Sequence, residues 1–286
     1  MGFTERRRRV RAILTGTACV HPGSVFDPLS ARIAEDLGFE MGMFAGSIAS
    51  LTVLGAPDIV VLTLTEFAEQ IRRITRAGTL PLLVDADHGY GNALSVMRTV
   101  AELEAAGAAA MTIEDTLLPR PYGDGATRLL PREEGLGKIR AALAARTDPA
   151  TVIVARTSAV SVTGLEDAIA RARLYAEAGA DALFFTGVTA PAELAALHAA
   201  TPLPIILGTL DDRLGGREAI ARQGVRIALQ GHQPFMAAVR AVHETLRALR
   251  DGTPPKALAN QPDPALMRTL TREAAYAAAT RDFLGG

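Results

Sequence analysis

One pattern recurs along the 286-residue chain: an alanine-rich stretch with helical spacing, a glycine, and then a short apolar run. The clearest copies are 35–46, 75–87, 104–115, 176–187 and 221–231. Each junction glycine suits the left-handed conformation that ends many helices. These glycines are Gly38, Gly78, Gly107, Gly179 and Gly224. The runs that follow are apolar on both faces, which is typical of buried parallel strands.

The apolar runs predict eight strands. Their expected ranges are 17–20, 39–44, 81–84, 109–113, 151–155, 181–185, 203–207 and 226–229. Because helical patterns separate most of them, we predict an α/β chain whose parallel strands close into a (β/α)8 TIM barrel. A doubly wound open sheet is the alternative, but no Gly-x-Gly-x-x-Gly motif follows the first strand.

The repeat stops near residue 250. The segment DGTPPK (251–256) is interpreted as a hinge, and a final helix is expected over 263–283. A helix beyond a proline-rich hinge is readily exchanged between subunits. We therefore expect a barrel domain over 1–250, followed over 251–286 by a hinge and a C-terminal helix that packs on a neighbouring subunit.

Composition favours a soluble, cytoplasmic protein without a nucleic-acid or membrane partner. Hydrophobic residues make up 49% of the chain and the net charge is −1, so a large core is possible and no charged surface stands out. No signal peptide and no apolar stretch of about 18 residues is present. The single cysteine, Cys19, excludes an internal disulfide and a cysteine-based metal cluster. The basic run 6–9 is expected to be a solvated helix end.

Acidic residues follow two adjacent predicted strands. Asp85 and Asp87 follow the third strand, while Glu114 and Asp115 follow the fourth. In such barrels the active site lies at the carboxyl ends of the strands, and carboxylates held close repel unless a cation lies between them. Oxygen ligands suit Mg²⁺ or Mn²⁺. We predict a metal site in which Asp85 binds directly and Asp87 and Glu114 bind through water; helix caps and turns are the alternative.

Other strand ends supply candidate substrate ligands. Arg156 follows the fifth strand, and its planar guanidinium matches a carboxylate, with an ion pair to the neighbouring acids as the alternative. Ser47 and the backbone amides near Gly46 are candidates for binding a second carboxylate oxygen, although serine in such a loop often only forms a turn. His232, within GHQPF at the mouth of the eighth strand, is either a substrate ligand or an exposed loop histidine.

Four segments together resemble the isocitrate lyase and phosphoenolpyruvate mutase superfamily, in order over roughly 10–250. They are FAGSIASLTVLGAPDIVVLTLTE (44–66), VDADHGYGNA (84–93), AAMTIEDTLLP (109–119) and VIVART (152–157). The resemblance implies a (β/α)8 barrel, Mg²⁺ and small α-keto or α-hydroxy acid substrates that react through enolate-like intermediates. It also implies a homotetramer built as a dimer of helix-swapped dimers.

The resemblance assigns metal-site roles to Asp85, Asp87 and Glu114, and binding of a substrate carboxylate to Arg156. It places Ser47 in the loop that binds the C1 carboxylate and carbonyl of the substrate. It adds Asp58, within GAPDIV, as a catalytic candidate, because the corresponding aspartate contacts substrate in several members.

The segment LPRPYGDGATRLLP (118–131) departs from the family pattern. Lyases of the family carry a Lys-Arg-Cys-Gly-His-like gate there, whose cysteine is the general acid of carbon–carbon cleavage. This segment has neither cysteine nor lysine, and only Arg120 and Arg128 remain for the cationic role that phosphonate chemistry requires. Isocitrate lyase, methylisocitrate lyase and phosphonate reactions are therefore disfavoured.

The overall pattern, with His232 at the mouth of the eighth strand, resembles most closely a branch without that cysteine. This branch is a group of Mg²⁺-dependent carboxy-lyases that convert oxaloacetate to pyruvate and CO₂ through a metal-bound enolate, in which the histidine contacts substrate and is a candidate proton donor. Cleavage of another small α-keto or 2-hydroxy diacid, as by an enzyme like methylisocitrate lyase or dimethylmalate lyase, and hydrolysis of oxaloacetate stay open as alternatives. A catalytically silent module that binds an α-keto acid is the non-enzymatic alternative.

Overall fold

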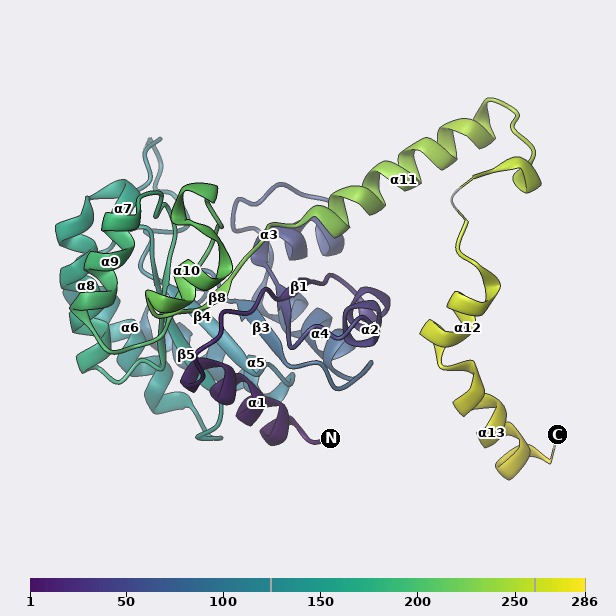
Figure 1. Cartoon of the computed structure of the whole chain (residues 1–286), viewed down its shortest axis with the longest axis horizontal. Helices are drawn as coiled ribbons and strands as arrows, with labels where there is room; N and C mark the ends of the chain where they lie inside the picture. Colours follow the sequence, from purple (N-terminus) through teal and green to yellow (C-terminus); the bar gives the residue numbers. More distant parts are fainter. Residues whose placement is uncertain (124, 260, 286) are drawn as a thin grey trace. The chain divides into compact units, whose positions relative to one another are not determined.

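Eight parallel strands form one sheet in the computed structural model, and each strand pairs with the next along the chain (Figure 1). The structure describes residues 1–123, 125–259 and 261–285. The strands are β1 (Gly23–Ser24), β2 (Gly42–Phe44), β3 (Leu82–Asp85), β4 (Ala110–Glu114), β5 (Val152–Thr157), β6 (Ala182–Phe185), β7 (Ile205–Leu207) and β8 (Val225–Ala228). A parallel bridge between Val20 and Ile227 joins the two edges of the sheet. The predicted (β/α)8 barrel is confirmed.

Helices alternate with these strands. They are α1 (Phe3–Thr15), α2 (Pro28–Asp36), α3 (Gly46–Ala49), the π-helical η1 (Ser50–Leu54), α4 (Leu64–Thr75), α5 (Ala93–Ala105), α6 (Arg132–Ala145), α7 (Ala159–Val162), α8 (Leu165–Glu177), α9 (Pro191–Ala200), the 3₁₀ turn η2 (Asp212–Leu214) and α10 (Gly216–Arg222). Local capping sets several starts. Thr63 and Glu66 form a capping box at α4, and the Asn92 side chain accepts hydrogen bonds from two amides at the start of α5.

The core lies on both faces of the sheet, as the apolar runs predict. Every residue of β2, β3, β4, β6 and β7 is buried. Burying one large apolar side chain contributes about 1.5–3 kcal/mol, so the barrel supplies a rigid base for the side chains at its strand ends.

Two details of the predicted repeat are wrong. The first strand is not 17–20, because β1 lies at Gly23–Ser24 and Val20 alone of the predicted range pairs with a strand. Gly78 does not adopt the left-handed conformation, unlike the other four junction glycines, whose φ values lie between 78° and 97°. Glycine suits position 78 for a different reason, because a Cβ there would overlap the Glu35 carboxylate.

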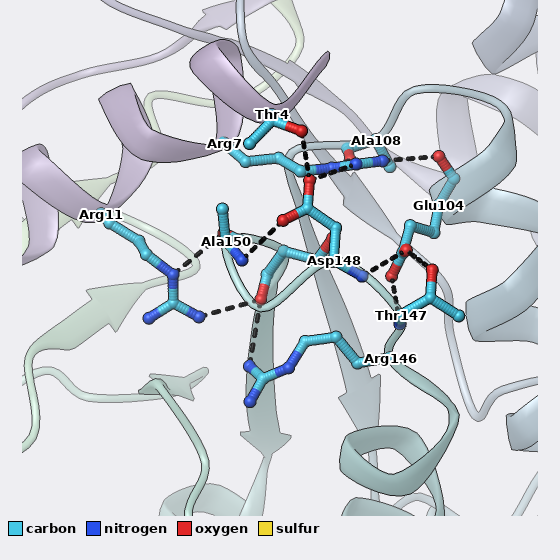
Figure 2. A network of polar contacts seen from close by, with 10 residues as sticks. Thr4, Arg7, Arg11, Glu104, Ala108, Arg146, Thr147, Asp148 and Ala150 are labelled. Atoms are coloured by element: carbon cyan, nitrogen blue, oxygen red, sulfur yellow. Dashed lines mark hydrogen bonds and ion pairs between the residues drawn. The ribbon is translucent and has the colours of Figure 1, made fainter.

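The expectation that the basic run 6–9 is solvated is wrong for Arg6 and Arg7, although Arg8 is exposed. Arg6 and Arg7 are only 7% and 5% exposed. Arg7 donates to the carbonyls of Glu104 (2.6 Å) and Ala108 (3.2 Å) and pairs with Asp148 at 2.7 Å, as Figure 2 shows. The fork of guanidinium donors thus holds α1 against the segment that precedes β4, at the end of the strands opposite the acids.

The chain divides into two compact units, Met1–Gly231 and a second that begins at His232. The second unit contains α11 (Gln233–Arg250), the 3₁₀ turn η3 (Pro255–Ala257), α12 (Pro264–Thr271) and α13 (Glu273–Leu284). The single helix expected over 263–283 is wrong, because Arg272 adopts a left-handed conformation (φ 59°) that separates α12 from α13. The expected division at residue 250 stays a prediction. No helix among the described residues is long and apolar enough to cross a membrane.

Candidate active site

The strand-end acids lie on neighbouring strands. Asp85 is the last residue of β3 and pairs in register with Thr112 of β4, while Glu114 ends β4 and pairs with Arg156 of β5. Because the strands are parallel, the side chains of Asp85, Glu114 and Arg156 all leave the sheet at the same end of the strands. The predicted cluster of two acidic strand ends and one arginine is therefore formed by the register of β3, β4 and β5.

Arg156 is the shared partner of two acids. Its Nη1 donates to Asp85 Oδ2, and its Nε lies 3.2 Å from Glu114 Oε2. The guanidinium carbon also lies 5.3 Å from the centre of the Phe184 ring. Burial lowers the pKa of Arg156, but attraction from Asp85 and Glu114 outweighs burial and leaves the pKa above its ordinary value. Arg156 therefore stays charged and fixes both carboxylates.

Asp87 is held by the backbone around it. Its amide donates to Asp85 Oδ1 (3.2 Å), and its carbonyl accepts from the Glu114 amide (2.9 Å). Asp87 itself has a positive φ of 47°, and Tyr90, three residues later, has φ 61°. Two non-glycine residues in this conformation within one turn indicate strain of about 1–3 kcal/mol each, which the surrounding contacts must hold in place.

Gly46 and Ser47 begin α3, immediately after β2. A Cβ at Gly46 would lie only 2.6 Å and 2.8 Å from the two carboxylate oxygens of Asp87, so glycine is required here for close approach. Gly46 is buried, whereas Ser47 is half-exposed. The structure thus brings Gly46 next to the acid cluster, and the roles of both residues in substrate binding stay predictions.

Negative charge exceeds positive charge in the cluster. Burial raises the pKa of Asp87 well above its usual range, and repulsion from Asp85 and Glu114 adds to the effect. Burial also raises the pKa of Glu114, against the attraction of Arg156. The single guanidinium does not balance the carboxylates, and a divalent cation would relieve the repulsion.

Among the described residues, no group of three or more histidine, cysteine or acidic side chains is arranged so that it could hold a metal ion by itself. Mg²⁺ takes only one or two direct carboxylates and completes its shell with water, so an open protein cage suits this ion. The donor chemistry and the excess of negative charge both fit Mg²⁺ or Mn²⁺.

Asp115 does not belong to the acid cluster, although it follows Glu114 directly. Its Oδ2 accepts hydrogen bonds from Arg171 Nη1 (2.9 Å) and the Tyr175 hydroxyl (2.7 Å), both on α8. Neighbouring residues of a strand point to opposite faces, which explains the separation from Glu114. Asp115 therefore pairs away from Asp85, Asp87 and Glu114, which stay the predicted metal-site residues.

Cys19 and His88 are buried and unsuited to proton transfer. Burial raises the pKa of the Cys19 thiol to about 11, and the thiol points to the Val20 carbonyl at 3.7 Å. Burial, together with the nearby Lys138 charge, lowers the pKa of His88 to about 4. His88 is therefore neutral near pH 7, and Cys19 is protonated.

Asp58 and His232, the two other catalytic candidates, are placed differently. Asp58 lies in the exposed loop between η1 and α4, and partial burial of its carboxyl and repulsion from Asp85 raise its pKa. Two residues later Val60 has φ 62°, which is unusual for a β-branched residue. His232 precedes α11 at the start of the second unit. Its role at the site stays a prediction.

Lys138, on α6, was missed by the sequence reasoning. Its ammonium is buried and donates to the His88 carbonyl at 2.8 Å. Burial lowers its pKa, against attraction from Glu134, Glu114 and Asp115. The signal in the sequence is the position of Lys138 on the apolar face of a helix, three residues after Gly135 and four before Ala142.

Residues 11–250 match the family described as phosphoenolpyruvate phosphomutase. The chain is 58% identical over 285 residues to a protein named oxaloacetate decarboxylase from Bradyrhizobium diazoefficiens, covering 100% of this chain and 99% of the relative. A protein of the same name from Rhodopseudomonas palustris is also 58% identical, with the same coverage.

Solved structures of related enzymes have the same fold. A phosphonopyruvate hydrolase in complex with oxalate and Mg²⁺ has a TM-score of 0.85 and 32% identity, covering 98% of this chain and 99% of that one. An oxaloacetate acetylhydrolase in complex with 3,3-difluorooxalacetate has a TM-score of 0.84 and 28% identity, covering 99% and 98%. Together with the sequence matches, these structures show that the chain belongs to the phosphoenolpyruvate phosphomutase family, within the phosphoenolpyruvate mutase/isocitrate lyase superfamily.

Proposed function

We propose that this chain is a carboxy-lyase that decarboxylates oxaloacetate to pyruvate and CO₂. The observation that carries the proposal is a cluster of strand-end carboxylates around Arg156 that has a cation-binding character but no nucleophile. The single cysteine, Cys19, is buried and stays protonated. The full-length relatives named oxaloacetate decarboxylase support this choice of substrate over other α-keto or 2-hydroxy diacids.

Asp85, Asp87 and Glu114 are the proposed holders of Mg²⁺, for which Mn²⁺ is a chemically similar substitute. The raised pKa values of Asp87 and Glu114 support this assignment, because the cluster lacks a balancing cation. A related phosphonopyruvate hydrolase was solved with Mg²⁺ and oxalate. When bound, Mg²⁺ supplies Lewis-acid chemistry that withdraws electrons from the keto group of the substrate.

Arg156 is the proposed ligand of the C1 carboxylate of oxaloacetate. Two of its nitrogens contact Asp85 and Glu114, and a guanidinium has five N–H donors, so donors remain for a substrate. Ser47 and the amide of Gly46 are proposed to orient the same end of the substrate, because α3 begins beside Asp87.

The reaction breaks the bond between C3 and C4, releases the C4 carboxylate as CO₂ and leaves the electron pair on an enolate of pyruvate. A proton then adds to C3. His232 is proposed to hydrogen-bond the reacting end and to help supply this proton, and Asp58 is the proposed catalytic group of the η1–α4 loop. No covalent intermediate with the protein is required, so the absence of a cysteine from segment 118–131 has no cost for this chemistry.

A homotetramer made of helix-swapped dimers is proposed for the assembly. No residue of α11 is buried, and its exposed apolar side chains recur at helical spacing: Met236, Val239, Val242, Leu246 and Leu249. Such a stripe is typical of a helix that packs on another surface. A cytoplasmic location is proposed alongside it, on the basis of the family and of the composition.

The direct test is release of pyruvate and CO₂ from oxaloacetate with Mg²⁺, measured beside EDTA-treated protein and Asp85→Ala. Free Mg²⁺ slowly decarboxylates oxaloacetate, so the excess over a protein-free control is the relevant rate. We expect both treatments to remove this excess. Formation of oxalate and acetate in place of pyruvate would identify a hydrolase, and binding of oxaloacetate without turnover would identify a non-catalytic binding module.

A further inference from the structure

We propose that Lys138 is a positioning residue of the acid cluster, which holds Asp87 in place by anchoring the backbone of the turn that carries it. The inference rests on the proposed function, because it takes this cluster to be the Mg²⁺ site.

The contact that defines the role is a single hydrogen bond. Lys138 Nζ donates to the carbonyl of His88 at 2.8 Å, and Lys138 is only 3% exposed. His88 directly follows Asp87 in the chain, so the lysine holds the peptide next to the Asp87 backbone. On the other side, the carbonyl of Asp87 accepts from the Glu114 amide at 2.9 Å. The Asp87 backbone is thus held from β4 and from α6.

The turn requires such support, because its conformation is unfavourable by itself. Asp87 and Tyr90 both have positive φ values, 47° and 61°. Residues in this conformation persist where neighbouring contacts determine them, and such positions are common at functional sites. The hydrogen bond from Lys138 lies between these two residues along the chain, at His88, and is therefore placed to fix the direction of the Asp87 side chain.

Lys138 also lies next to the metal-site glutamate. A small enclosed space between α6 and the sheet is lined by Glu114, Lys138 and Arg156, among others. The helix comes this close because Gly135, one turn before Lys138, has no side chain: a Cβ there would overlap the Tyr175 hydroxyl and lie 3.3 Å from Asp115 Cβ. The lysine thus adds a second positive charge on the α6 side of the acids.

Stability alone does not explain a lysine at this position. Burying an ammonium carries a large desolvation penalty, and Lys138→Met removes this penalty together with the hydrogen bond to the His88 carbonyl. Methionine has a similar length and no charge. A lysine that serves only the fold would be replaceable by methionine without loss of metal binding, whereas a positioning lysine would not.

The experiment compares Lys138→Met with Arg140→Met, which removes an exposed cation from the same helix. Mg²⁺ dissociation constants are measured by titration calorimetry without substrate, Tm is measured in EDTA, and kcat and KM for oxaloacetate are measured separately. We expect Lys138→Met to weaken Mg²⁺ binding by about 10–100-fold, since loss of groups that orient metal ligands has effects of this size. Its Tm in EDTA should fall by no more than about 10 °C, which is the most that one unsatisfied carbonyl explains. Arg140→Met should stay within about twofold of wild type in every measurement, by the usual smallness of exposed charge effects.

Wild-type Mg²⁺ affinity in Lys138→Met would overturn the inference. A fall in Tm of more than about 10 °C together with weaker binding would also overturn it, because this exceeds the effect of one unsatisfied carbonyl and Lys138 would then support the fold as a whole. If Lys138→Met does not fold, Lys138→Gln takes its place, with the same two criteria. The two failures can be told apart. If the wild-type protein neither binds Mg²⁺ nor decarboxylates oxaloacetate, the proposed function is refuted. If the wild-type protein does both and Lys138→Met behaves in the same way, only the role of Lys138 is refuted.

Discussion

Gly46→Ala tests the geometry of the acid cluster with the smallest possible change. Gly46 does not adopt a left-handed conformation and is the first residue of α3, so alanine suits its backbone. Replacing glycine by alanine at a compatible position stabilises a protein by about 0.4–1 kcal/mol. The backbone at position 46 therefore gives no reason to expect that Gly46→Ala lowers the free energy of unfolding.

The effect on Asp87 follows from the distances. The new methyl group would lie 2.6 Å from Asp87 Oδ1, and ordinary contact begins near 3.4 Å, so the carboxylate must retreat by about 0.8 Å. The Asp87 backbone is held in a positive-φ turn, which leaves side-chain rotation as the main response. A displacement of about 1 Å at a reacting group can cost on the order of 100-fold in rate. We expect kcat/KM to fall by about 10–100-fold, or roughly 1.4–2.7 kcal/mol.

The assay measures decarboxylation at a series of Mg²⁺ concentrations, together with Tm in EDTA. The matched control is Gly137→Ala on α6, where a Cβ would meet no atom within 4 Å. We expect the control to keep wild-type activity, while Gly46→Ala requires more Mg²⁺ and keeps its Tm within a few degrees. Wild-type kcat/KM and an unchanged Mg²⁺ requirement in Gly46→Ala would refute the proposal that the Asp87 carboxylate acts from beside Gly46.

Three further predictions concern charge and assembly. Arg156→Lys should lower kcat/KM by on the order of 100-fold, because a point charge cannot contact both Asp85 and Glu114 as the guanidinium does; activity near wild type would contradict this. The raised pKa values of Asp87 and Glu114 mean that the metal-free folded chain binds protons more tightly than the unfolded chain, so its Tm in EDTA should fall as the pH rises above about 4 through the raised values. The gain in Tm from Mg²⁺ should grow over the same pH range, and a pH-independent gain would count against the metal site. Val242→Glu on the apolar stripe of α11 should reduce the mass measured by light scattering, whereas Ala237→Glu, an exposed position away from the stripe, should not; equal masses for both variants would argue against assembly through α11.

The strand pattern predicted that Asp85 and Glu114 lie together, because the barrel imposes a simple rule. Once β3 and β4 are recognised as parallel neighbours, Asp85 and Glu114 must leave the sheet at the same edge. The sequence offered an ion pair of Arg156 with the neighbouring acids as one alternative, but it could not specify both partners. The pairing depends on the exact register, in which Glu114 lies opposite Arg156, and on the reach of the guanidinium across to Asp85 on β3.

Asp115 shows the limit of reading acids from strand ends. Adjacent residues of a strand face opposite sides, so Glu114 and Asp115 could not both enter the cluster. The structure pairs Asp115 with Arg171 and Tyr175 on α8. Arg171 and Tyr175 lie 56 and 60 positions after Asp115 in the sequence, so the spacing of residues around Asp115 does not indicate these partners.

The buried cations are the second kind of failure. Arg7 and Lys138 both have side chains that the composition suggests are solvated, and both are buried against backbone carbonyls. Arginine and lysine are rarely buried unless they are paired, so the residue type alone gives the wrong expectation. For Lys138 the helical spacing held the necessary signal, because its position falls on the apolar face of α6.

The charge balance of the cluster has a consequence for the order of binding. Oxaloacetate carries two carboxylates, and its approach to Asp85, Asp87 and Glu114 adds negative charge to a site whose acids already repel each other. Arg156 and Lys138 contribute two positive charges, which already face the acids of the cluster and do not offset two further carboxylates. A divalent cation must therefore bind before the dianion or together with it. Oxalate, as an unreactive dianion, should give no calorimetric heat with EDTA-treated protein and clear binding after Mg²⁺ is added; tight binding of oxalate to the metal-free chain would show that Arg156 and the α3 amides, rather than a metal, hold the substrate.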